Sequence, residues 1–312
     1  MSEHICHVAC AFDTRNLCRA LGPDFGIEAT FNEVWNDPAN DLIAQFGGVT
    51  RRADNFSAEM IAYCRQESNK GGPDADPNWR KKLTFTLSAL SHRSIDRHMK
   101  PVFMHFKQAT DAAKGFNECT MYCDVMMLRK RFGRGTIMDG DMLDPAKQTA
   151  SDDLATLARE TIRRELIRMH TFNPDDDHIH TWLDEMIGRA QQFNLRLAEY
   201  DRIFTNPDPD RVRQYLDATN FYDETSPLIQ ITQRLANGES VEPAEVDQAV
   251  AMTETKHGRY ARTLAHAVGY VRSAGKLWRG EQSIDETKPQ FDIGNAELAM
   301  VYPELGERAY AG

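Results

Sequence analysis

Helical periodicity runs along most of this sequence and limits the folds that it can adopt. Apolar residues recur three and four positions apart along most of the 312 residues, and this spacing lines one face of an α-helix. A strand would instead alternate apolar and polar residues between hairpin turns, and the chain offers no convincing example. The pattern predicts an all-α protein, a multi-helix bundle in which residues 1–312 form a single domain.

Glycine and proline divide the chain into expected elements. The pair Gly47-Gly48 predicts a break and a functional loop over residues 47–56. Pro101 should kink, without ending, a helix over about 79–115. Further helices are expected near 3–20, 57–66, 116–132, 152–171, 177–204, 208–218 and 226–236, with one or two more across 243–280. The bundle would have a helical core over 1–135, additional packed helices over 150–280 and an irregular tail over 281–312.

Net charge limits the partners that this chain can bind. A formal charge of −10 disfavours a surface that tracks duplex nucleic acid, although a metal site inside an acidic protein can still bind a small phosphoester. No apolar run approaches the roughly 20 residues of a membrane-spanning helix, and the first residues show no secretory signal. We therefore expect a soluble cytoplasmic protein whose six cysteines are reduced thiols.

The stretch SHRSIDRHMKP, residues 91–101, places polar residues in an otherwise apolar helix. His92 and Asp96 are four positions apart, so their side chains lie on one face. Leu87 and Phe103 flank that face, which indicates that both polar groups point into the core. A buried imidazole and carboxylate need partners, and a metal ion would serve both. The alternative is a hydrogen-bonded pair in the core or on a solvated edge.

Other metal-competent side chains occur in the first half of the chain. They are His4 and His7 on the first helix, Asp13 six residues beyond His7, Asp54 after the glycine break, and the pair Glu118 and Tyr122 on a later helix. Bundle metal sites are built from such ligands on facing helices. Histidine and carboxylate ligands suit zinc, and also iron or manganese.

The order of these segments resembles a known superfamily. His7, then FGGVTRRADNF, then LSALSHRSIDRHMKP is similar to the pattern of the zinc-dependent phospholipase C and single-strand-specific nuclease superfamily, over about the first 135 residues. Proteins of that superfamily are all-α and hold up to three zinc ions, so the resemblance implies this fold with additional C-terminal helices. The metal ligands that it implies are His7, Asp54 as the bridging or first carboxylate, His92 with Asp96, and His98 or His105 as the following histidine.

Two departures from the superfamily pattern affect the expected site. Its secreted members use the mature N-terminal residue as a ligand, whereas this chain shows no processing signal. The later His-x-x-x-Glu pair is also missing, and Glu118 and Asp124 stand there instead, with Glu118 as the expected metal ligand. On an unbroken helix His98 lies about 200° from Asp96, and His105 is also about half a turn away. Either histidine would therefore need the proline kink.

The leading functional hypothesis is a metal-dependent hydrolase of a small phosphoester. Zinc lowers the pKa of a bound water, and a carboxylate orients or deprotonates the nucleophile; Asp54 is the candidate for that catalytic role. Four arginines near the candidate ligands are predicted to bind phosphate oxygens, with ordinary solvated surface as the alternative for any one of them. They are Arg51, Arg52, Arg93 and Arg97.

Two other functions stay open at this point. Glu118, with Glu254 and His257, could instead belong to a di-iron or other metal oxidoreductase in a helical bundle. A non-catalytic helical interaction protein that kept the fold would bind no metal. Its surface should instead expose a large apolar patch.

Two Cys-x-x-x-Cys pairs raise a separate question. Cys6 with Cys10 and Cys119 with Cys123 lie on predicted helices, and four thiolates from facing helices can hold a structural zinc ion or an iron–sulfur cluster. Packing is the simpler expectation, because free cysteine is among the most buried residue types. His266, on a largely apolar helix, is likewise expected to be a satisfied core histidine.

Overall fold

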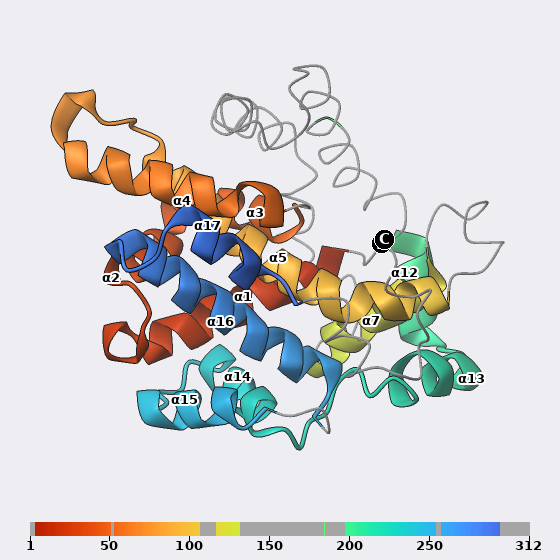
Figure 1. Cartoon of the computed structure of the whole chain (residues 1–312). Coiled ribbons are helices and arrows are strands. Elements are labelled where there is room, and N and C mark those ends of the chain that lie inside the picture. The colour runs from red at the N-terminus through yellow and green to blue at the C-terminus, as the bar shows by residue number, and fades with distance from the viewer. Residues whose placement is uncertain are drawn as a thin grey trace.

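The structure is a computed structural model of the whole chain, and it describes residues 4–50, 53–106, 117–131, 184, 197–253 and 257–293. Within these ranges every assigned element is a helix, and no strand occurs (Figure 1). One hydrophobic core joins apolar side chains from Ile5 to Ile293. The prediction of an all-α, multi-helix protein is confirmed.

The elements follow the chain in a simple order. They are α1 (His4–Leu21), η1 (Pro23–Phe25), α2 (Ala29–Trp35), η2 (Pro38–Asn40), α3 (Asp41–Gly48), α4 (Ala53–Lys70), η3 (Gly72–Asp74), α5 (Trp79–His105), α7 (Glu118–Arg131), α12 (Leu197–Thr205), α13 (Pro209–Val212), the π-helix η5 (Arg213–Asp217), α14 (Pro227–Ala236), α15 (Pro243–Ala251), α16 (Arg259–Arg279), α17 (Ile284–Thr287) and η6 (Lys288–Phe291). In the described residues, no helix is both long and apolar enough to cross a membrane.

Helix α5 organises the fold. It packs against α1, α2, α3, α4 and α16 (Figure 1), and most of its side chains between Lys82 and Phe103 are buried. α16 comes from the second half of the chain, and the Ser94 hydroxyl of α5 donates a 2.6 Å hydrogen bond to the Thr263 carbonyl oxygen of α16. The helix that carries His92 and Asp96 is therefore enclosed by both halves of the sequence.

The glycine pair lies inside α3, so the predicted loop over residues 47–56 is wrong. A Cβ atom at Gly47 would lie 2.3 Å from the Phe85 carbonyl oxygen, so glycine at this position lets α3 approach α5 closely. α4 then begins at Ala53, four residues before its predicted start. α3 ends at Gly48, so four residues at most separate the two helices.

Pro101 lies inside α5, which continues to His105. The prediction that this proline does not end the helix is confirmed. The rest of the predicted helix, residues 107–115, lies outside the described part of the chain.

The predicted irregular tail is partly helical. α17 begins with a capping box, in which Ser283 and Glu286 each accept a hydrogen bond from the other's backbone N–H. η6 follows directly and ends at Phe291. The correction applies to 284–291, because residues after Ile293 lie outside the described structure.

Candidate metal site

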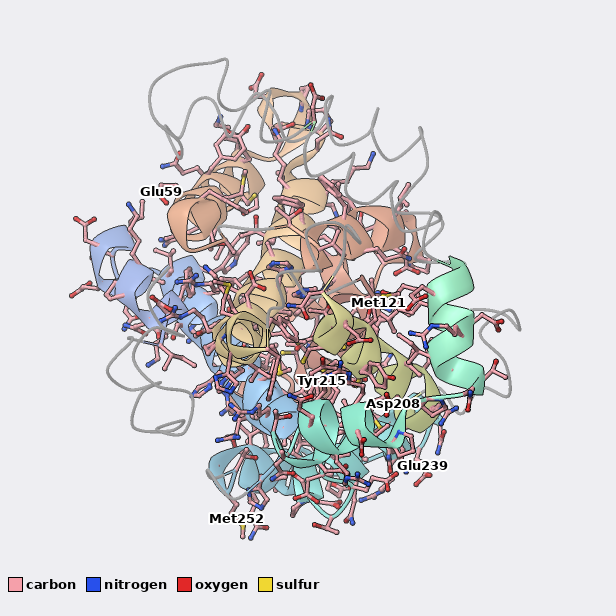
Figure 2. All side chains as sticks on the ribbon, turned by 90° about the vertical axis from the view of Figure 1, so that its right-hand side faces the viewer. Glu59, Met121, Asp208, Tyr215, Glu239 and Met252 are labelled. Carbon is pink, nitrogen blue, oxygen red and sulfur yellow. The ribbon has the colours of Figure 1, made fainter. Side chains whose placement is uncertain are left out.

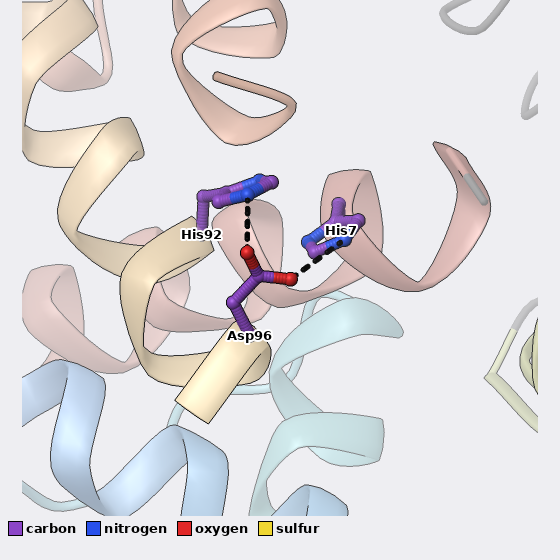
Figure 3. Close-up of side chains that lie close together, drawn as sticks. All are labelled: His7, His92 and Asp96. Carbon is purple, nitrogen blue, oxygen red and sulfur yellow. Dashed lines mark ion pairs between the residues drawn. The ribbon is translucent and has the colours of Figure 1, made fainter. Parts of the chain in front are cut away.

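Three side chains converge where α1 packs on α5 (Figure 3). His92 and Asp96 lie one turn apart on α5, and His7 faces them from α1. His92 Nε2 is 3.3 Å from one Asp96 carboxylate oxygen, and His7 Nε2 is 3.9 Å from the other. Each residue offers one ligand atom, and these atoms all lie within 4.8 Å of one another. No other group of three histidine, cysteine or acidic side chains meets this criterion among the described residues.

A backbone carbonyl sets the orientation of the His92 ring. Its Nδ1 atom lies 3.0 Å from the carbonyl oxygen of Gly48, at the end of α3. With the proton on Nδ1, this contact leaves Nε2 as the nitrogen that can bind a metal. The His7 ring stacks on the His92 ring, with 4.1 Å between centroids and 14° between planes. Three helices thus hold the two imidazoles in place.

The group is buried at its histidines and partly open at its carboxylate. The side chains of His7 and His92 are each 4% exposed, whereas the Asp96 side chain is 24% exposed. Solvent therefore reaches the group from the side of Asp96.

The chemistry of the donor set suits one divalent metal ion, and one of the two printed ligand separations matches it. Nitrogen and oxygen ligands bind zinc at about 2.0–2.2 Å in a tetrahedral arrangement, so two ligand atoms on one ion lie about 3.3–3.5 Å apart. The His92–Asp96 separation of 3.3 Å meets this condition, and the His7–Asp96 separation of 3.9 Å is slightly longer. Three protein ligands leave a coordination position open, as in catalytic zinc sites. The same two-histidine, one-carboxylate set also suits iron(II).

His98 belongs to a second histidine cluster. Its Nε2 atom lies 2.6 Å from Nδ1 of His266 on α16, and the two rings stack with 4.8 Å between centroids. Burial lowers the pKa of His98 well below its usual value, and burial followed by the charge of Arg262 lowers the pKa of His266 to about 4. Both rings are neutral at pH 7 and share one N–H···N hydrogen bond. The structure therefore assigns His98 to the α16 side of α5, away from His7 and His92.

His105 and Glu118, two further expected ligands, also lie elsewhere. His105 is exposed at the end of α5, with its ring edge-on to Phe106. Glu118 accepts a 3.2 Å hydrogen bond from the Tyr215 hydroxyl and lies 3.4 Å from Arg211 Nε. Figure 2 shows Tyr215 beside α7, the helix that Glu118 begins. These contacts join α7 to the segment of α13 and η5.

Asp54 lies in the first turn of α4 rather than in a loop. Its side chain lies outside the described structure, as do Arg51 and Arg52. The catalytic role of Asp54 and the phosphate-binding role of these two arginines stay predictions.

Arg93 and Arg97 bind the chain itself. Arg93 Nη2 and Arg97 Nε lie 2.9 and 2.7 Å from the same carboxylate oxygen of Asp292. Arg97 Nε also donates a 3.2 Å hydrogen bond to the Ile293 carbonyl oxygen. Neither arginine is ordinary solvated surface, since both side chains are mostly buried.

All six cysteines are buried free thiols. Burial raises the pKa of Cys6 and Cys123 well above the usual value, and it raises the pKa of Cys18 to about 12. Metal ligation needs thiolates, and the two Cys-x-x-x-Cys pairs contribute to no three-ligand group in the described residues. All six side chains belong to the hydrophobic core.

Two further buried carboxylates, Asp13 and Asp124, link helices. Asp124 accepts hydrogen bonds of 2.8 and 3.2 Å from two backbone N–H groups in the first turn of α1, and one of 2.7 Å from the Tyr200 hydroxyl. It therefore caps α1, and burial raises its pKa to about 6. Asp13 accepts a 2.8 Å hydrogen bond from the Tyr260 hydroxyl of α16, 247 positions away. Sequence carries no signal for either contact, nor for the Gly48 carbonyl that orients His92, because the partners are distant along the chain.

Comparison with known proteins adds no relative. No family model, no curated protein and no solved structure matches this chain. The chemistry of the group formed by His7, His92 and Asp96 therefore has to carry the functional argument.

Proposed function

We propose that this protein is a metal-dependent hydrolase of a small phosphoester, in which His7, His92 and Asp96 hold one divalent ion, with zinc as the first choice. The observation that carries the proposal is the convergence of two buried histidines and one partly exposed carboxylate from α1 and α5. Bound zinc supplies a Lewis acid that lowers the pKa of a coordinated water towards neutrality.

Other groups of the chain would orient the ligands, admit the substrate and position the nucleophile. The Gly48 carbonyl holds the His92 ring in the tautomer that binds through Nε2. Asp96 faces the accessible side, where water and substrate enter. Asp54 is our candidate for orienting the nucleophile, because α4 begins only a short connection after the end of α3 that contacts His92.

The described residues favour one ion over the cluster of up to three that the superfamily resemblance implies. His98 pairs with His266, and Glu118 pairs with Tyr215 and Arg211. His105 is exposed at the end of its helix. None of these three expected ligands therefore adds a second ion to the group.

Two alternatives make different predictions. The ligand set also suits a mononuclear iron(II) oxidoreductase. For the di-iron alternative, Glu118 belongs to no three-ligand group among the residues that the structure describes, and Glu254 lies outside them. An interaction protein would need a large apolar surface, and the exposed large hydrophobic side chains in the described part are Met104 and Met252 (Figure 2 labels Met252). Two exposed methionines fall short of the extended apolar patch that this alternative predicts, as far as the described ranges extend.

Elemental analysis of the purified full-length protein tests the proposal. We expect about one zinc ion per chain, because the three ligands fit one ion. The variant His92→Ala should lose the metal, and the matched control His105→Ala, an exposed histidine on the same helix, should keep it. Stoichiometric iron would move the assignment to the oxidoreductase. A protein that binds neither metal would contradict both the phosphoesterase and the oxidoreductase. His92 and Asp96 would then be an ordinary ion pair.

Hydrolysis of a chromogenic phosphodiester and of the matching phosphomonoester tests the reaction class. The metal-loaded protein should hydrolyse at least one of them, and His92→Ala should not. Activity that survives in His92→Ala, or bound zinc without hydrolysis of either ester, would contradict the proposed phosphoesterase.

A further inference from the structure

Three nitrogen donors converge on one carboxylate oxygen, and two of them belong to arginines that are adjacent in sequence to proposed metal ligands. Arg93 and Arg97 each follow a proposed metal ligand by one position, so they project from α5 about 100° around the helix from those ligands. The Oδ1 atom of Asp292 lies 2.9 Å from Arg93 Nη2, 2.7 Å from Arg97 Nε and 2.8 Å from the backbone nitrogen of Ile293. Two guanidinium groups and one backbone N–H around a single oxygen make a compact oxyanion site.

We propose that Arg93 and Arg97 bind the phosphate group of a ligand, and that Asp292 occupies this site as an internal carboxylate which the ligand displaces. Carboxylate and phosphate oxygens are equivalent acceptors for arginine, and both form short charge-assisted hydrogen bonds with it. The phosphate identity of the ligand rests on the proposed function. The anion site itself does not require the metal.

Asp292 is the most exposed of the three side chains, so it is the one that a ligand can displace. The side chains of Arg93 and Arg97 are 18% and 13% exposed, whereas the Asp292 side chain is 35% exposed. An anion from solvent therefore approaches the arginines from the side of the aspartate. Ion pairs at partly exposed positions contribute little, and a phosphate dianion brings more charge to the two guanidinium groups than one carboxylate does.

Apolar side chains on either side of Asp292 anchor its segment. Phe291 and Ile293 are buried, and the Phe291 ring packs edge-on against Tyr270 of α16 at 6.3 Å between centroids. Displacement therefore requires a movement of the Asp292 side chain and not the release of the whole segment. For the same reason, removal of the carboxylate should uncover the arginines while the fold is kept.

Calorimetric titration of inorganic phosphate into the metal-free full-length protein tests this inference. Asp292→Ala should bind phosphate about tenfold or more tightly than the wild type, because the competing carboxylate is gone. The matched control is Asp285→Ala, which removes the same charge from an exposed position of α17 nearby in the chain. It should leave the affinity unchanged. Adding Arg97→Met to Asp292→Ala should abolish the gain.

The outcomes separate this inference from the proposed function. Equal phosphate affinities for the wild type and Asp292→Ala, with thermal unfolding showing both folded, would overturn the inference. Acetate that binds Asp292→Ala as tightly as phosphate does would overturn the assignment to a phosphate group. Metal content is measured on the same proteins before chelation. If zinc is bound but Asp292→Ala shows no increase in phosphate affinity, the metal site is supported and only the anion site is overturned.

Discussion

Two histidine clusters lie on different faces of α5, and the charges around them differ. On the α1 side, His7 and His92 meet the carboxylate of Asp96. On the α16 side, His98 stacks on His266 in the field of Arg262 and other arginines. A carboxylate offsets the charge of a bound cation, whereas nearby arginines favour neutral imidazoles. One helix therefore presents histidine beside a carboxylate on one face, the group proposed to bind a metal, and histidine packed in the core on another.

The comparison also shows that proximity along the chain does not decide which residues share a site. His98 is two positions from Asp96, yet it faces another helix because successive residues turn by about 100°. His7 comes from a separate helix and still reaches Asp96. If the two clusters are independent, substitutions in one should leave the other unchanged.

Zinc affinity should depend strongly on Asp96 and hardly at all on His98. Asp96→Ala removes the charged ligand, so zinc affinity should fall about a hundredfold or more, while His98→Gln should change it by no more than about twofold. Competition with a chromophoric chelator measures both variants. Equal losses in the two would mean that the clusters form one unit.

Acid should destabilise the α16 cluster. The pKa of His266 is about 4 in the folded protein and about 6.5 in the unfolded chain. Between these values the unfolded state binds the extra proton, so stability is full above about pH 6.5 and falls as pH drops towards 4. His266 alone should contribute up to about 3 kcal/mol to this loss.

Urea unfolding of the metal-free protein at pH 7 and pH 5 measures this effect. The variant His266→Gln should show a smaller pH dependence than the wild type, even if it is less stable at both values. A pH dependence that is unchanged in His266→Gln would contradict the buried neutral pair.

The Asp124 cap of α1 should respond to acid with the opposite sign. Its folded pKa is about 6 against the usual 3.8, so the folded state binds the proton more tightly. This group therefore favours folding below about pH 4, and its contribution is lost as pH rises through 6, by at most about 2–3 kcal/mol. Asp124→Asn should remove that component, and unfolding at pH 4.5 and 7 measures it. If Asp124→Asn keeps the wild-type change in unfolding free energy between these pH values, another group is responsible for it.

Loss of one hydrogen bond between α5 and α16 should have the smallest effect. Ser94→Ala removes the donor to the Thr263 carbonyl oxygen and should cost about 1 kcal/mol of unfolding free energy. Zinc affinity should not change, because the bond lies on the α16 side of the helix. A large loss of metal binding in this variant would mean that α16 also positions the metal group.

Local patterns in the sequence predicted a substantial part of this structure. The all-α class follows from helical periodicity, and the pairing of His92 with Asp96 follows from their spacing of four on one helix. The predicted break at Gly47 fails because the same residue type serves close packing against Phe85. Glycine breaks a helix in one context and lets helices touch in another, and only the packing distinguishes the two cases.

Which residues share a face of each helix follows from the sequence alone, because the turn per residue is a local property of the backbone. Which of these faces meet depends on how the helices pack in three dimensions. This packing joined His7 to His92 and Asp96, gave His98 to His266, and placed Asp292 on Arg93 and Arg97. These contacts depend on how distant helices pack their apolar surfaces, and no local spacing encodes that arrangement.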